Sequence, residues 1–206
     1  MITNGDTNLI EEPTYGELLR SMAVKMNVMP LYDELLYQYP EFLNWSGSHN
    51  KMLHHYGRGG LARHTWEIVD VGMHIIPQLN LCGKVDPREY YLAALFHDTG
   101  KMFDYKPKDK LFCEWESTEH KRLIYHLPRS CLIWHDIVGK FSELNDMYHD
   151  TVLHAILAHH GKREFGSPVA PKTRTAWLLH LCDGISARMD DCDWLDVVKT
   201  PIHQNI

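Results

Sequence analysis

The chain has 206 residues, 44% of them hydrophobic, and its 21 Lys and Arg against 27 Asp and Glu give a formal net charge of -6. This length suffices for one domain with a sizeable hydrophobic core and is too short for two domains of typical size. A surface of this charge repels phosphate backbones, so any contact with nucleic acid requires a local basic patch.

Nothing at the start of the sequence resembles a targeting signal. Residues 1–6 lack the basic start and apolar run of a signal peptide, and no apolar stretch approaches the about 20 residues that cross a bilayer. The five cysteines form no CxxC pair, which is typical of reduced thiols. We expect a soluble, cytoplasmic protein with no membrane partner.

Most of the chain carries the pattern of helices. After a polar tail over residues 1–12, the sequence predicts a helix over 15–29 that Pro30 ends and a second helix over 31–42. Apolar residues then recur at spacings of three and four from Leu61 to Ile75, after a Gly-Gly turn, and His64 falls on that buried stripe.

Three more helices follow along the chain. Asp86-Pro87-Arg88-Glu89 is a helix start, and this helix reaches Gly100, with His97 and Asp98 in its last turn. Asp150 is expected to cap a helix that ends at His159-His160. The last helix begins near Thr173 and places Asp183 in the middle of an apolar face.

Strand signals are confined to short segments around 111–115 that could pair. No repeat, low-complexity tract or Gly/Ser linker divides the chain. We therefore predict an all-α protein, folded as a single compact helical bundle, with room for a small strand pair near 111–115.

Histidine and aspartate on the predicted buried faces are the main functional signal. Any one of them is better explained as an ordinary hydrogen-bonded residue. Together they have no common structural explanation, because they come from four helices and several sit at helix ends beside glycine. The predicted metal ligands are His64, His97, Asp98, His126, His159, His160 and Asp183. Nitrogen and oxygen donors without cysteine suit Mn, Fe, Co or Zn, with one or two ions per chain.

The remaining histidines are given ordinary roles. His120 is an alternative to His126, and the roles of His54, His55 and His154 stay open. Solvent-facing or hydrogen-bonding roles are expected for His49, His74, His135, His149, His180 and His203.

From about Met52 to Met189 the chain resembles the HD superfamily of metal-dependent phosphohydrolases, with a particular likeness to the HD domain of bacterial 3′-5′ exoribonucleases. The motifs that carry this resemblance are 54–56 with 59–65, 95–101, 156–161, 164–168, 171–173 and 178–183. It implies an N-terminal helical extension over 1–48, an HD phosphohydrolase domain over 49–192 and a C-terminal tail over 193–206.

The resemblance also implies roles for the metal ligands. His64, His97, Asp98 and Asp183 would hold a first ion. His126, His159 and His160 would hold a second, with Asp98 as the bridge. Asp98 and Lys101 are the predicted catalytic residues, and Lys101 would face the phosphate. The predicted substrate-binding residues are Arg58, Lys101, Lys162, Arg163 and Lys172; for the loop residues among them a solvated surface is an equal alternative.

Two departures from the family pattern stand out. Tyr125 occupies a position where relatives usually have Gly, and residues 1–48 are too short for the OB-fold that precedes the exoribonuclease domain.

The predicted function is hydrolysis of phosphoester bonds by a metal-activated water. The substrate we expect is a nucleotide, such as a nucleoside phosphate or a dNTP, with a dNTP triphosphohydrolase as one form. The alternative is a 3′-5′ exonuclease acting on RNA or single-stranded DNA. A cyclic dinucleotide phosphodiesterase or a low-turnover regulatory nucleotide-binding protein is a second alternative. The oligomeric state stays open, with a homo-oligomer among the options.

Overall fold

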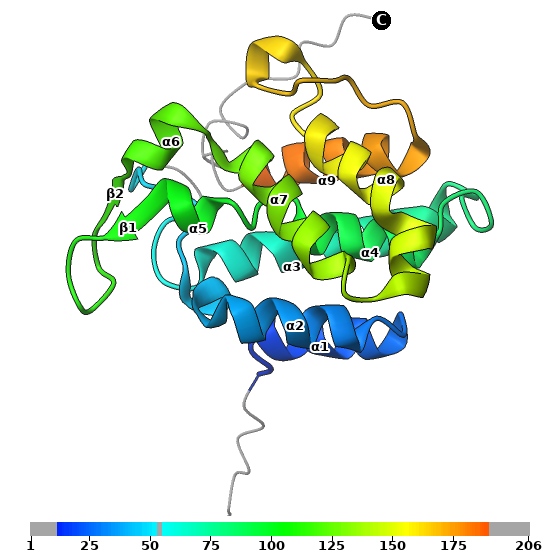
Figure 1. Cartoon of the computed structure of the whole chain (residues 1–206), viewed down its shortest axis with the longest axis horizontal. Coiled ribbons are helices and arrows are strands. Elements are labelled where there is room, and N and C mark those ends of the chain that lie inside the picture. Colours follow the sequence, from blue (N-terminus) through cyan, green and yellow to red (C-terminus); the bar gives the residue numbers. More distant parts are fainter. Residues whose placement is uncertain (1–11, 53–54, 190–206) are drawn as a thin grey trace, which may run out of the picture.

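The computed structural model describes residues 12–52 and 55–189. Helices account for most of this part of the chain, with one two-stranded antiparallel sheet, so the predicted all-α fold is confirmed (Figure 1). The α-helices are α1 (Tyr15–Lys25), α2 (Met29–Gln38), α3 (Gly60–Gln78), α4 (Pro87–Phe96), α5 (Lys101–Asp104), α6 (Glu119–Leu123), α7 (His126–Val138), α8 (Ser142–Ala158) and α9 (Arg174–Met189). Two 3-10 helices, η1 (Pro40–Asn44) and η2 (Arg163–Phe165), and the strands β1 (Tyr105–Pro107) and β2 (Trp115–Ser117) complete the described elements.

Helix α4 lies at the centre of the bundle. Every residue from Tyr90 to Phe96 is buried, because α3, α7, α8 and α9 all pack against this helix. A helix surrounded on all sides is apolar around its whole circumference, which matches its run of Leu, Ala and Phe. Asp86 caps it as predicted, accepting a hydrogen bond from the backbone N–H of Arg88.

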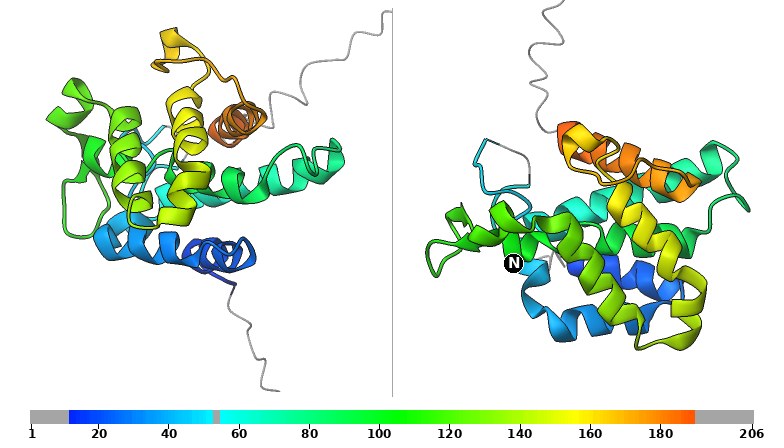
Figure 2. Two further views of the ribbon diagram at one scale, coloured as in Figure 1. Left: turned by 45° about the vertical axis from the view of Figure 1, so that its right-hand side comes forward. Right: turned by 45° about the horizontal axis from the view of Figure 1, so that its top comes forward.

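Helices α1 and α2 lie together on one side of the bundle and α9 lies on the opposite side (Figures 1 and 2). Leu19 of α1 and Leu35 of α2 belong to the same hydrophobic core as α3 and α4.

The boundary expected at residue 48 stays a prediction, and the tail expected over 193–206 lies outside the described residues, as do His54 and His203. Within the described residues, the helices are too short or too polar to span a lipid bilayer.

The N-terminal helices differ from the prediction. The first helix ends at Lys25, not at Met29, because Asn27 adopts a left-handed backbone with φ of 55°. Pro30 does not end it but lies in the first turn of α2, where a missing N–H costs nothing. The second helix stops at Gln38, and Pro40 begins the separate turn η1.

The small strand pair predicted near 111–115 is confirmed, and its two strands lie on either side of a connecting loop. The strands are β1 and β2, with Tyr105 paired to Ser117, and residues 108–114 form the connecting loop between them. The carboxylate of Asp109 closes this loop by accepting hydrogen bonds from the backbone N–H groups of Leu111 and Glu114. Residues 111–113 therefore form the turn, while the carbonyl of Glu114 still accepts a hydrogen bond from the backbone N–H of Lys108.

Two helix boundaries near the predicted ligands also differ. Helix α8 begins at Ser142, so Asp150 is an exposed residue within it and not its cap. Helix α4 ends at Phe96, and His97 is its C-cap residue. Gly100 then allows a close approach to α7, because a Cβ atom there would lie 2.2 Å from the carbonyl oxygen of His126.

Candidate metal centre and its cavity

The predicted ligands converge from five helices, α3, α4, α7, α8 and α9, on the middle of the bundle. His64 of α3 lies beside His97 and Asp98 at the end of α4, and the ligand atoms of these three lie within 4.8 Å of one another. A second group with the same spacing comprises His126, which begins α7, and His159 and His160, which follow the end of α8. It is His126, and not the alternative His120, that belongs to this group.

Asp98 links the two groups. Its Oδ2 atom lies 3.3 Å from Nε2 of His64 and 3.2 Å from Nε2 of His97. Its Oδ1 atom lies 3.4 Å from Nε2 of His126 and 3.6 Å from Nε2 of His159. One carboxylate thus faces both groups, with one oxygen toward each. Asp183, on α9, adds an Oδ1 atom 3.2 Å from Nε2 of His64.

The imidazole rings are fixed by their Nδ1 atoms. At the ends of α4 and α8, Nδ1 of His97 and of His159 each contacts the backbone carbonyl three residues earlier, at 2.8 and 2.7 Å. Nδ1 of His160 lies 2.7 Å from the carbonyl oxygen of Phe165. A carbonyl can only accept, so Nδ1 of each ring carries the proton and Nε2 keeps its lone pair.

The other two rings are oriented by side chains that sequence reasoning missed. Asp104, at the end of α5, places Oδ2 3.2 Å from Nδ1 of His126 and is fully buried. Ser186 Oγ lies 2.9 Å from Nδ1 of His64 and donates to Glu67. The sequence did contain a signal for Glu67 and Ser186. Each lies one helical turn after a predicted ligand, Glu67 after His64 and Ser186 after Asp183.

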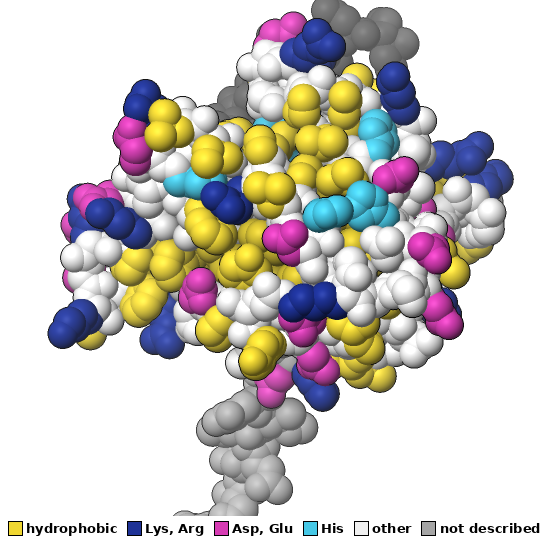
Figure 3. Space-filling model, viewed as in Figure 1, with side chains coloured by type: hydrophobic (Ala, Val, Ile, Leu, Met, Phe, Trp, Pro, Cys, Tyr) yellow, Lys and Arg dark blue, Asp and Glu magenta, His cyan; other side chains and the backbone are white. Residues whose placement is uncertain are grey.

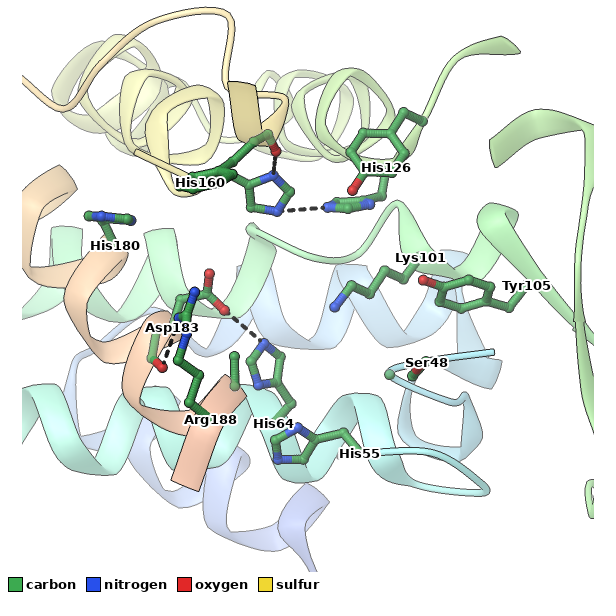
Figure 4. A pocket seen from close by; sticks show the side chains of 15 residues that line it. Ser48, His55, His64, Lys101, Tyr105, His126, His160, His180, Asp183 and Arg188 are labelled. Carbon is green, nitrogen blue, oxygen red and sulfur yellow. Dashed lines mark hydrogen bonds and ion pairs between the residues drawn. The ribbon is translucent and has the colours of Figure 1, made fainter. Parts of the chain in front are cut away.

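The lone pairs of these rings point at one another. Nε2 of His97 lies 3.4 Å from Nε2 of His64. Nε2 of His126 lies 3.3 Å from Nε2 of His160, and Figure 4 shows this second contact. Two acceptors at this distance repel unless a cation or proton lies between them. Within the described residues, Asp98 Oδ1 and His159 Nε2 are buried without any hydrogen-bond partner. Both atoms carry lone pairs that a divalent cation could accept, so their burial without a partner fits a metal site.

The ionisation of the site also suits a cation. Burial lowers the pKa of His97 and of His126, and burial with the neighbouring imidazoles lowers the pKa of His160 to about 3. These rings are therefore neutral at neutral pH, as metal ligands must be. Burial alone would raise the pKa of Asp98, but Lys101 and His97 outweigh it and hold that pKa well below its usual range.

His64 and Asp183 shift each other's pKa in opposite directions. Burial favours the neutral ring, but the carboxylates of Asp183 and Asp98 outweigh it and raise the pKa of His64. Burial likewise opposes the charge on Asp183, yet the contact with His64 lowers the pKa of Asp183. Both carboxylates of the site therefore stay ionised.

A cavity of about 470 Å³ opens onto both groups. Lys101 lines it and reaches between His126 and His160 on one side and His64 and Asp183 on the other (Figure 4). Its Nζ atom lies 2.6 Å from Asp98 Oδ2. Burial would lower the pKa of Lys101, but the Asp98 carboxylate outweighs it and raises that pKa, so the ammonium keeps its charge.

The other predicted substrate-binding residues lie outside the cavity lining. Arg58 is exposed, with Nε donating to Asn44 Oδ1 at 2.9 Å. The side chains of Lys162, Arg163 and Lys172 are exposed on the segments between α8 and α9. Their roles toward substrate stay predictions.

Several lining residues were missed by the sequence analysis, were given ordinary roles, or, like His55, were left open. His180 lines the cavity while its Nδ1 contacts the carbonyl of His159 at 2.7 Å. His55 also lines it and places Nε2 2.7 Å from Glu67 Oε2. The aromatic side chains that line it are Tyr105, Tyr125 and Phe165. Adjacency of Tyr125 to His126 was visible in the sequence, but which way its ring turns depends on the backbone before α7.

The family model of the HD domain matches residues 61–188. This segment begins in the first turn of α3 and ends in the last turn of α9, so it spans every predicted ligand. No solved structure matches the chain significantly.

Proposed function

The chain belongs to the HD domain family of metal-dependent phosphohydrolases, and we propose that this enzyme hydrolyses phosphoester bonds of small nucleotides, namely nucleoside phosphates or dNTPs. The cavity is the observation that carries the proposal. Its volume of about 470 Å³ lies in the range of pockets that enclose a small molecule. Its lining joins the histidine and aspartate groups to Lys101 and to aromatic rings that could pack against a base.

The distribution of charge supports a small substrate. The net charge is -6, and on the face seen in Figure 3 the Lys and Arg side chains are scattered among acidic and hydrophobic ones. A protein that tracks a nucleic acid backbone gains affinity from a continuous basic groove. A small nucleotide would need only the contacts inside the cavity.

In this proposal His64, His97, Asp98 and Asp183 would hold one divalent ion, and His126, His159 and His160, together with Asp98, would hold a second. Mn, Fe, Co and Zn all suit these donors. The bound metal supplies Lewis acidity and lowers the pKa of water toward neutrality. Asp98 is held ionised, and Lys101 presents a fixed positive charge where a phosphoryl group would develop negative charge. The Nδ1 partners keep each ring aligned during turnover.

A 3′-5′ exonuclease is the second candidate, and Phe165 favours it. This ring lines the cavity and is 59% exposed, and the exposed Lys162 and Arg163 precede it closely in the sequence. An exposed aromatic ring next to cations is a common platform for a single-stranded base.

A substrate screen separates the two candidates. The purified protein, supplied in turn with Mn, Co, Zn or ferrous iron, is assayed on nucleoside monophosphates, dNTPs, cyclic dinucleotides, a short RNA and a short single-stranded DNA. We expect the fastest turnover on a free nucleotide, with little change between about 50 and 200 mM salt, because few phosphate contacts are made. Stepwise release of mononucleotides from a 3′ end, faster than any free nucleotide and steeply weakened by salt, would establish the exonuclease instead.

Asp104 provides a prediction about the second ion. Asp104→Asn should weaken metal binding at His126, His159 and His160 by about 10- to 100-fold, because the amide no longer orients and polarises His126 as the carboxylate does. Calorimetric titration with Mn measures this, and the ion at His64 and His97 should remain. Asp146→Asn, at an exposed site on α8, is the matched control. Equal loss of both ions, or of neither, would contradict the assignment.

A further inference from the structure

Tyr125 has an unusual backbone for a residue with a side chain. Its φ is 73° and its ψ is 162°, immediately before the first residue of α7. Glycine adopts this region readily, whereas a Cβ atom makes it sterically costly. The conformation is imposed by its surroundings, since the N–H of Tyr125 bonds to the carbonyl of His120 and His126 must begin α7. Such strain in a bulky residue is typical of functional sites.

The ring of Tyr125 packs directly on the second histidine group. Its centroid lies 4.1 Å from that of His126 and 6.1 Å from that of His160. Gly166 faces it, since a Cβ atom there would lie 3.5 Å from Cε1 of the tyrosine. The ring is therefore held in place at the wall of the cavity, beside the proposed second ion.

The hydroxyl group of Tyr125 is unused within the described residues. The side chain is half-buried, yet the phenol makes no hydrogen bond with any of them. In contrast, the buried Tyr90 and Tyr91 both donate to backbone carbonyls, at 2.7 and 2.8 Å. A half-buried phenol usually has a partner, and the space in front of this one is the cavity.

We propose that Tyr125 is a substrate-binding residue whose hydroxyl donates a hydrogen bond to a phosphoryl oxygen bound beside His126 and His160. The inference rests on the proposed function, because it takes a phosphate group as the occupant of the cavity. If Tyr125 served only the fold, its interactions should stabilise the folded state. Instead, its backbone is strained, and its hydroxyl makes no hydrogen bond within the described residues.

The experiment measures binding of inorganic phosphate to the Mn-loaded protein by calorimetry, alongside melting temperature and Mn content. Tyr125→Phe keeps the ring and should weaken phosphate binding by about 10-fold or more, the usual effect of losing a hydrogen bond to a charged group. Its melting temperature and Mn content should not change. Tyr125→Gly should weaken phosphate binding at least as much, with an equal or higher melting temperature because the strain is relieved. Tyr37→Phe, at a side chain 83% exposed on α2, is the control.

Phosphate affinity unchanged in both Tyr125 variants would overturn the inference, as would a wild-type protein that does not bind phosphate. A melting temperature lowered in Tyr125→Gly, with phosphate affinity unaltered, would assign the residue to the fold. If phosphate binds in the manner expected but no nucleotide or oligonucleotide is hydrolysed, the proposed function fails and the role of Tyr125 in phosphate binding stands.

Discussion

Asp98→Asn is expected to release metal from both ligand groups and to lower kcat/KM by about 1,000-fold or more. Asp98 is the one ligand that faces both groups, with Oδ2 toward His64 and His97 and Oδ1 toward His126 and His159. An amide removes the negative charge and keeps only one good acceptor atom. The effect should exceed the about 10- to 100-fold loss typical of residues that only orient a ligand.

The measurement pairs metal content, determined by elemental analysis after dialysis, with turnover on the best substrate of the screen. Asp136→Asn, on an exposed position of α7, tests whether removal of any carboxylate has the same effect. Circular dichroism verifies that the Asp98 variant remains helical. A variant that keeps two ions and half of its activity would refute the bridging role.

Four of the five helices that carry ligands could be predicted from local pattern, whereas α7, which begins at His126, was not predicted. His64 follows the apolar spacing of α3, and Asp183 interrupts the apolar face of α9. The ends of α4 and α8 are marked by glycines shortly after His97-Asp98 and directly after His159-His160. Helical periodicity is a property of neighbouring residues, so the sequence is enough to place these side chains on inward faces.

The supporting contacts depend on tertiary structure and escaped prediction. Asp104, at the end of α5, contacts His126 at the start of α7, and Gly100 allows these two helices to approach closely. No spacing rule relates Asp104 to His126, because the hairpin of β1 and β2 and helix α6 intervene. The break after Lys25 likewise depends on a left-handed Asn27, a conformation that asparagine adopts only in some contexts.

Basic residues were the least predictable part of the site. Lys101 follows Asp98 by three positions, and the turn from α4 into α5 places it on the same side as the carboxylate. Arg58, Lys162 and Lys172 lie on loops, and Arg163 begins the short 3-10 helix η2. The sequence gives no direction for a long side chain in such segments, and none of the four lines the cavity.

Lys101→Met is expected to lower kcat/KM by about 100- to 1,000-fold, the usual effect of removing one fixed charge that stabilises a transition state. The ammonium is held protonated by Asp98 at 2.6 Å and lines the cavity, so it meets a phosphoryl group without reorganisation. Metal binding should respond in the opposite direction from Asp98→Asn. Loss of the ammonium removes a positive charge that repels the ion, so at neutral pH the variant should bind Mn as tightly as the wild type or more tightly.

Acidification should reveal the second effect of Lys101. The lysine helps to hold the pKa of Asp98 below its usual range, so Lys101→Met raises that pKa and lets protons compete with the metal at a higher pH. Mn titrations between about pH 5 and 8 measure both effects, with Lys25→Met on the exposed face of α1 as the control. An inactive Lys101→Met variant that retains Mn at neutral pH would show that the lysine charge acts on the substrate. A residue that merely supports the metal ligands would lose Mn together with activity. A kcat/KM within about threefold of the wild type would remove Lys101 from the catalytic residues.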